Sequence, residues 1–195
     1  MGSEKVSTLK QVVAGVLVSV IVAILTGATV PWWWHRLPHN RLLLRSDVGA
    51  SYEDLRRFLE QENFMKADQE TANLLLWIVN KQKAGRLNSQ DIQALPCKDL
   101  QTIDDLWKTY SNGKFGFGIQ QQIWLSSGGV KGAWNSEIYE KFSETVGWKY
   151  EDSWKSSTEL TYDMRAPKGH LPTDRTAMSN NDKIYNLVIN SKCPF

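Results

Sequence analysis

Aromatic and basic side chains alternate in a stretch near the C-terminal end, where the helical periodicity of the chain fades. The aromatic members are Trp148, Trp154, Tyr162 and His170, and the basic members among and after them are Lys149, Lys155, Arg165, Lys168 and Arg175. Flat rings can stack on a flat apolar ligand, and cations beside them can pair with carboxylates at its edge. The pattern predicts a site for a planar, acid-edged ligand. The alternative is that Trp148 is a core residue and that the lysines form a solvated rim.

The sequence carries none of the common catalytic motifs. It has no phosphate-binding GxxxxGK[ST] loop, no GxSxG nucleophile turn and no HExxH zinc motif. The three histidines are His35, His39 and His170, with a proline between the first two. Asp104 and Asp105 are adjacent, so on a helix they would point about 100° apart and could not flank one glycosidic bond. We therefore expect a binding protein, with no catalytic residue and no metal site.

Length and composition restrict the partners further. The 195 residues suffice for one ordinary domain and a short appendage. The net charge is +2 without any run of five like charges, which argues against binding of nucleic acid. Nine tryptophans indicate stacking surfaces, membrane-interface anchors or both. A sugar-binding module built on the tryptophans is a further alternative.

The two cysteines, Cys97 and Cys193, have no metal-binding spacing. A disulfide between them would close a loop of nearly the whole domain, and the sequence leaves this open. The simpler interpretation is a reducing compartment in which Cys97 is a small core residue.

An apolar segment without charged residues covers residues 12–30, and Trp32, Trp33 and Trp34 follow it. Nineteen residues at about 1.5 Å each span roughly 28 Å, close to the ~30 Å hydrocarbon core of a bilayer. Indole rings favour the headgroup layer. We expect a tail at residues 1–11, a transmembrane anchor at 12–34, a linker at 35–41 and one domain at 42–195. A cleaved signal peptide is the alternative, although its apolar part is usually shorter.

The domain itself reads as helices joined by loops, so we expect an all-α, mainly helical fold. Apolar spacing and capping residues predict helices near residues 52–59, 67–84, 89–95, 102–110, 119–125 and 134–146. Ser51 with Asp54, and Thr102 with Asp105, match the capping-box pattern. We expect residues 154–172 to form a long loop with one short strand near 160–164, and loops of that length are usually functional.

Six strings stand in a fixed order along this domain. They are Ala67-Asp68-Gln69-Glu70-Thr71, Leu95-Pro96-Cys97, Asp99-Leu100-Gln101-Thr102-Ile103-Asp104-Asp105-Leu106-Trp107, Tyr110-Ser111-Asn112-Gly113-Lys114-Phe115-Gly116-Phe117-Gly118-Ile119-Gln120, Val146-Gly147-Trp148 and Ala166-Pro167-Lys168-Gly169-His170-Leu171-Pro172. In this order and spacing they resemble the genomes-uncoupled four family, over roughly residues 42–172 or beyond. Leu95, Gly118 and Ser51 depart from the residues usual in that family.

The resemblance implies a cupped-hand helical domain whose apolar palm binds protoporphyrin IX or magnesium-protoporphyrin as an exchangeable ligand, without a permanent cofactor. It implies regulation of magnesium chelatase in chlorophyll biosynthesis, with the large chelatase subunit as partner, in a cyanobacterium or a plastid. The segment from Leu87 to Leu95 would form the wall opposite the aromatic and basic stretch. The ligand-binding residues expected on this basis are Leu87, Ile92, Leu95, Trp148, Trp154, Tyr162, Arg165, Lys168 and His170.

Two expectations complete this picture. The anchor would make the chain a single-pass protein of the plasma or thylakoid membrane, with its domain on the cytoplasmic or stromal side. The alternative function is a tetrapyrrole- or bilin-sensing signalling or scaffold module that does not stimulate the chelatase.

Overall fold

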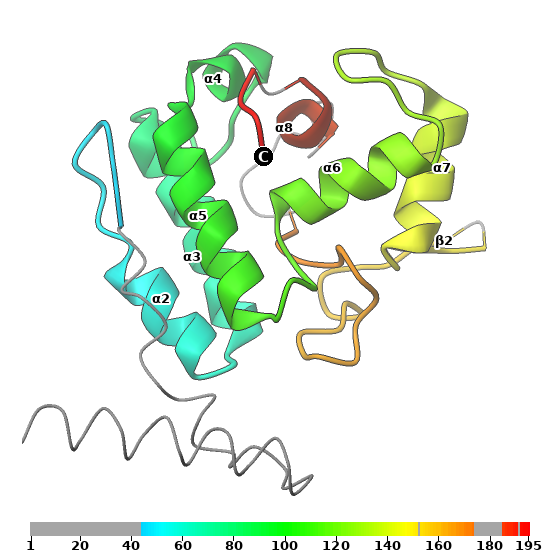
Figure 1. Ribbon diagram of the computed structural model, residues 1–195, viewed down its shortest axis with the longest axis horizontal. Helices are drawn as coiled ribbons and strands as arrows, with labels where there is room; N and C mark the ends of the chain where they lie inside the picture. The colour runs from blue at the N-terminus through cyan, green and yellow to red at the C-terminus, as the bar shows by residue number, and fades with distance from the viewer. Residues whose placement is uncertain (1–43, 152, 174–184, 191) are drawn as a thin grey trace, which may run out of the picture. The chain divides into compact units, whose positions relative to one another are not determined.

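The computed structural model describes residues 44–151, 153–173, 185–190 and 192–195, which fall within the compact unit Leu42–Phe195. This part of the chain forms seven helices and one two-stranded hairpin, so the expectation of a mainly helical fold is confirmed (Figure 1). The elements are α2 (Glu53–Glu60), α3 (Phe64–Ile78), α4 (Ser89–Ala94), α5 (Cys97–Tyr110), α6 (Phe117–Ser126), α7 (Ser136–Thr145), β1 (Lys149–Tyr150), β2 (Ser153–Trp154) and α8 (Tyr185–Asn190).

The helix starts differ from the predicted capping boxes. Tyr52 is the residue before α2 and no side chain caps this helix, so the predicted role of Ser51 is wrong. Helix α4 is capped by Asn88, which forms a capping box with Asp91. Thr102 lies inside α5, and its hydroxyl donates to the carbonyl oxygen of Arg45 at 2.8 Å. The starts of α2 and α4 lie within one residue of those predicted, whereas α5 begins five residues earlier. The caps were missed because several polar residues compete for each cap, and tertiary contacts decide among them.

Two other elements also differ from expectation. Helix α3 begins at Phe64 behind the Asn63 cap and ends at Ile78, since Asn80 has a φ of 56° and cannot continue a right-handed helix. No strand forms at residues 160–164. The strands lie earlier, where Lys149 pairs with Trp154 in an antiparallel hairpin directly after the helix-ending Gly147, whose φ is 78°.

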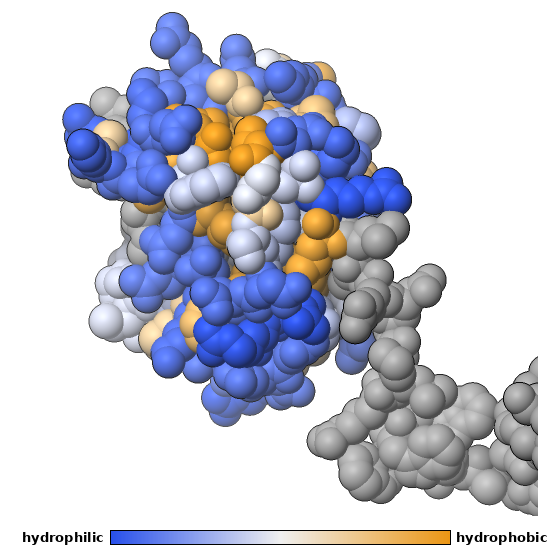
Figure 2. All heavy atoms as spheres, turned by 90° about the vertical axis from the view of Figure 1, so that its left-hand side faces the viewer, coloured by the Kyte–Doolittle hydropathy of each residue, from blue (hydrophilic) through white to orange (hydrophobic). Residues whose placement is uncertain are grey.

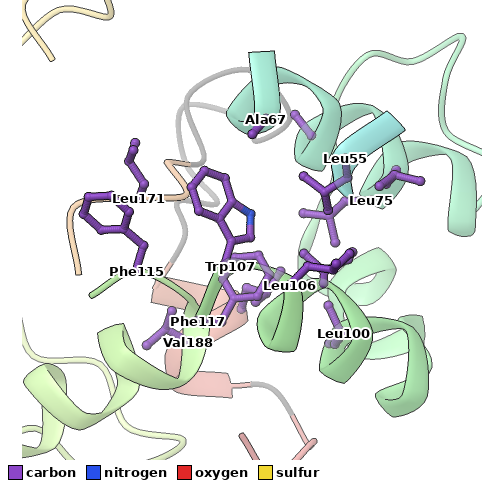
Figure 3. Packing of buried hydrophobic residues seen from close by; sticks show 14 of the residues in the cluster. Leu55, Ala67, Leu75, Leu100, Leu106, Trp107, Phe115, Phe117, Leu171 and Val188 are labelled. Atoms are coloured by element: carbon purple, nitrogen blue, oxygen red, sulfur yellow. The ribbon is translucent and has the colours of Figure 1, made fainter. Parts of the chain in front are cut away.

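The core is built around Trp107 of α5 (Figure 3). Its indole lies 6.1 Å from the ring of Phe64 and its Nε1 donates to the hydroxyl of Thr71 at 2.9 Å. Leu171 of the long loop and Val188 of α8 belong to the same buried cluster. The loop and the C-terminal helix are therefore parts of the core rather than additions to it.

A disulfide joins Cys97, at the first turn of α5, to Cys193 near the chain end, over a sequence separation of 96 residues. The preferred interpretation of Cys97 as a reduced core residue is therefore wrong. Spacing could not reveal the pair, because the two cysteines meet only when α8 packs into the domain and brings the chain end back to α5.

No helix in the described residues is long and apolar enough to cross a membrane. The longest of them, α3, has 15 residues and extends about 22 Å, against roughly 30 Å for the bilayer core. This finding contradicts the expected localisation as a single-pass membrane protein and corrects it. The tail, the anchor expected at residues 12–34 and the linker lie outside the described residues.

Candidate functional site

The loop that follows the hairpin, residues 155–173, carries four of the nine residues predicted to bind a ligand, and its second half is fastened to α6. The side-chain Nε2 of Gln120 donates to the carbonyl oxygens of Gly169 at 3.0 Å and Pro172 at 2.7 Å. The backbone nitrogen of Gly116 donates to the carbonyl oxygen of Leu171 at 2.9 Å. Gly169 has a φ of 76°, and a Cβ there would lie 2.6 Å from the Cδ1 of Ile123. The positive φ, together with this close approach, favours glycine at position 169.

The end of the loop is fixed to α3. Asp68 is buried, and its two carboxylate oxygens accept from the backbone nitrogen and the hydroxyl of Thr173 at 2.5 and 2.6 Å. Hydrogen bonds to an ionised acceptor are stronger than neutral ones, and more so away from water. The pair of contacts, which we call the Asp68 clamp, sets the position of the loop end.

His170 holds the loop together from inside. It is fully buried, its Nδ1 lies 2.6 Å from the carbonyl oxygen of Val146, and its Nε2 accepts from the backbone nitrogen of Thr161 at 3.2 Å. A carbonyl oxygen can only accept, so Nδ1 carries the proton and the ring is the neutral tautomer. Both nitrogens are thus engaged within the protein, and the ring supports the site instead of facing a ligand.

Trp148 is also a supporting residue. It is buried, and its Nε1 donates to the carbonyl oxygen of His170 at 2.8 Å. The rings of Trp148 and Phe142 form a T-shaped pair with centroids 5.6 Å apart. The structure therefore places Trp148 in the core, which is the alternative that the sequence left open.

Trp154 lies at the surface as one member of an aromatic stack formed by Trp134, Tyr139 and Trp154. The Tyr139 ring is 5% exposed, and its centroid lies 4.7 Å from that of Trp134 and 5.6 Å from that of Trp154. Trp134 and Trp154 are 47% and 40% exposed. Each indole thus presents ring surface to solvent while Tyr139 supports it from within.

Sequence reasoning missed Trp134 and Tyr139 as members of this surface. Asn135 caps α7, so Trp134 is the residue before the cap and Tyr139 is the fourth residue of the helix. Apolar residues at these two positions form the hydrophobic staple that fixes how a chain enters a helix. That spacing could have indicated the contact.

The basic residues near the loop are partly committed to local ion pairs. Lys149 is buried and its Nζ lies 2.9 Å from Glu140. Arg165 is exposed, and its Nε and Nη2 donate to the carboxylate of Asp163. These hydrogen bonds lower the pKa of Asp163 to about 2. Lys168 is exposed and Tyr162 is half-buried. The predicted ligand residues that reach the surface are therefore Trp154, Tyr162, Arg165 and Lys168.

The remaining predicted residues, Leu87, Ile92 and Leu95, are buried. Ile92 lies in the short helix α4, and Leu87 and Leu95 lie shortly before and after it along the chain. Helix α4 packs against α8. Figure 1 shows α4 and the hairpin at different ends of the domain. The structure therefore does not bring the segment from Leu87 to Leu95 and the aromatic stack together as facing walls. Within the described ranges, no group of three or more acidic, histidine or cysteine side chains could hold a metal ion.

Comparison with known proteins relates this architecture to one family. The GUN4-like family model matches residues 45–186. The uncharacterized protein ycf53 of Pyropia yezoensis is 38% identical over 138 residues, which are 69% of this chain and 55% of that protein. The chloroplastic tetrapyrrole-binding protein of Arabidopsis thaliana is 29% identical over 142 residues, which are 65% of this chain and 49% of that protein. The chain thus spans about half the length of these relatives.

Two solved structures share the fold. The structure of GUN4 from Chlamydomonas reinhardtii superposes with a TM-score of 0.62 at 28% identity, covering 76% of this chain and 94% of that one. The ligand-free structure of Arabidopsis thaliana GUN4 gives a TM-score of 0.59 at 27% identity, covering 73% and 96%.

Proposed function

The chain belongs to the GUN4-like family, and from this premise we propose that it binds a tetrapyrrole, protoporphyrin IX or magnesium-protoporphyrin, as an exchangeable ligand. One relative carries tetrapyrrole binding in its name. In this chain the observation that carries the proposal is the half-exposed Trp154 ring, supported from within by Tyr139. A supported, solvent-facing indole offers a rigid apolar surface that costs little side-chain entropy when a flat ring covers it.

The accessible cations suit the acid edge of such a ligand. A porphyrin of this class carries carboxylates at one edge, and Arg165 and Lys168 are exposed on the same loop as Tyr162. Arg165 is paired with Asp163, so it would have to share or exchange this partner to meet a ligand carboxylate. Such exchange at the surface costs little because exposed ion pairs are weak.

The expected affinity is moderate. Burying about 300–400 Å² of apolar ligand surface at ~25 cal/mol/Å² contributes roughly 8–10 kcal/mol, and association costs on the order of 4 kcal/mol or more. The balance of about 4–6 kcal/mol corresponds to a dissociation constant of roughly 1 mM to 40 µM from apolar burial alone, and pairing of the ligand carboxylates with Arg165 or Lys168 would tighten it. His170, the one histidine in the described part of the chain, is engaged at both ring nitrogens, so it would not add a bond to a ligand metal. These terms suit a carrier or sensor that releases its ligand.

A titration of the full chain with protoporphyrin IX tests the proposal. We expect a red shift of the ligand's Soret band and quenching of tryptophan fluorescence. Trp154→Ala should weaken binding roughly 5- to 30-fold, since it removes a stacking surface. Trp77→Ala is the matched control, because Trp77 is 43% exposed but lies on α3, away from the hairpin (Figure 1). No spectral change up to about 1 mM ligand, or equal losses in both variants, would overturn the proposal.

We also propose that the loaded protein regulates magnesium chelatase through its large subunit. The test is a chelatase assay with the chain added, in which wild type should stimulate and Trp154→Ala should require more ligand to do so. Binding without stimulation would instead favour a tetrapyrrole- or bilin-sensing scaffold.

A further inference from the structure

A second exposed indole, that of Trp134, lies close to the Trp154 ring that carries the proposed function. Both side chains are partly exposed to solvent, and the ring of Tyr139 contacts both. Its centroid lies 4.7 Å from that of Trp134 and 5.6 Å from that of Trp154, so the two indole centroids are at most about 10 Å apart. Two exposed indoles at this separation lie within reach of one macrocycle.

The core behind Trp134 holds its ring in place. The indole of Trp134 lies nearly parallel to that of buried Trp124, at 12° and with centroids 6.5 Å apart. Trp124 donates from Nε1 to the carbonyl oxygen of Val130 at 3.3 Å, and a Cβ at Gly129 would lie 2.2 Å from the Trp124 ring. The turn between α6 and α7 is thus packed closely on Trp124, and this packing sets the position of Trp134.

The two exposed indoles are inclined to each other. The Tyr139 ring makes an angle of 48° with Trp134 and 25° with Trp154, so the indole planes differ by at least about 23°. A flat ligand that stacks on one indole therefore meets the other at an angle. Aromatic rings favour both offset-stacked and edge-to-face contacts, so each indole can contribute to binding. The pair offers two supported contacts at a set mutual angle.

We propose that Trp134 is a second contact residue for the tetrapyrrole, and that the pair of indoles favours a closed macrocycle over an open-chain tetrapyrrole. This inference rests on the proposed function. An indole contains one pyrrole ring fused to a benzene ring, so a single indole leaves part of a four-pyrrole ligand uncovered. A second indole within about 10 Å removes more of that apolar face from water.

The preference for a closed ring follows from the cost of ordering the ligand. Covalent bonds hold the four pyrroles of a macrocycle in one plane before it binds. An open-chain tetrapyrrole can rotate about the bonds between its pyrroles, and these rotations must stop before two of its rings can meet two positioned indoles. Cyclisation removes such a cost in advance. The preference should therefore depend on the presence of both indoles.

Titrations of the full chain with protoporphyrin IX and with biliverdin test the inference. Both ligands carry two propionate side chains, so the comparison isolates the closed ring from the carboxylates. We expect wild type to bind protoporphyrin at least about 10-fold more tightly than biliverdin. Trp134→Ala should weaken protoporphyrin binding roughly 5- to 30-fold and should reduce the preference over biliverdin to less than half of its wild-type ratio.

Two further variants keep the test independent of folding and of non-specific adsorption. Trp134→Leu should reproduce both effects, because it keeps apolar packing on Tyr139 but offers no flat ring. Trp77→Ala removes a similarly exposed indole from α3 and should change neither affinity. This control matters because apolar surface is also present on the side of the domain where α2 lies (Figure 2), and an apolar ligand can adsorb there.

The outcomes separate this inference from the proposed function. If Trp154→Ala weakens protoporphyrin binding and a folded Trp134 variant does not, the inference is overturned and the proposed function stands. Equal losses for protoporphyrin and biliverdin in the Trp134 variants overturn the role of the pair in specificity. Absence of protoporphyrin binding in every form overturns the proposed function and the inference with it.

Discussion

The Asp68 clamp offers a direct test of how the long loop is positioned, by the substitution Asp68→Ala. The carboxylate accepts two hydrogen bonds from Thr173, at 2.5 and 2.6 Å, and both residues are buried. Each hydrogen bond to a charged partner contributes about 1.5–3 kcal/mol, and unpaired buried donors remain after the change. The loop end can turn toward water, where these donors find new partners, and this offsets part of the lost free energy. We therefore expect the free energy of unfolding to fall by about 2–4 kcal/mol.

Urea unfolding of the full chain, followed by far-ultraviolet circular dichroism, measures this loss. Thr173→Val removes the hydroxyl alone and should lower the free energy of unfolding by about 1–3 kcal/mol. The loss in the double variant should differ from the sum of the two single losses by at least about 1 kcal/mol. Asp105→Ala is the control, because Asp105 is exposed on α5 and its removal should change stability by less than about 0.5 kcal/mol. A loss below about 1 kcal/mol for Asp68→Ala, or additive single effects, would refute the reasoning.

Three further predictions concern the covalent link, a buried carboxylate and the exposed cations. Cys97→Ser should lower the free energy of unfolding by at most about 4–5 kcal/mol, because the unfolded chain gains entropy when a link across 96 residues is removed. Calorimetry should then show a melting temperature lower by roughly 10 °C. Burial raises the pKa of Asp104 above its usual value despite its ion pair with Lys108, so the folded state binds this proton more tightly than the unfolded state. The stability of wild type relative to Asp104→Asn should therefore fall as the pH rises from about 4, as urea unfolding at several pH values can show; an increase would contradict it. Arg165→Ala and Lys168→Ala should each weaken protoporphyrin binding about 2- to 5-fold and leave binding of its dimethyl ester unchanged, because the ester lacks the carboxylates.

The sequence predicts helices better than it predicts their ends. The apolar centre of α3 and the helix-ending turn after Tyr110 are local features, and both occur where expected. The end of α3 is predicted too late, at residue 84, whereas Asn80 already adopts a left-handed conformation. Single residues with this conformation are difficult to predict, since asparagine favours it only weakly.

The candidate site shows a different limit. Trp148 and Trp154 lie six residues apart among similar neighbours, yet the first is a core residue and the second is half exposed. The distinction depends on the hairpin and on the carbonyl oxygen of His170, which accepts from the Trp148 indole. Contacts between distant segments decide such cases, as they also decided the disulfide, and spacing in one sequence does not contain them.

The aromatic stack has an optical consequence. The indoles of Trp124 and Trp134 lie nearly parallel, at 12°, with centroids 6.5 Å apart, and Trp134 continues through Tyr139 to Trp154. Chromophores held this close couple their electronic transitions, so the circular dichroism of the native protein should carry an exciton band on top of the helical signal. Helix content derived from the spectrum alone would then be biased. The same band, however, would respond to changes in the geometry of these few side chains even when every helix stays intact.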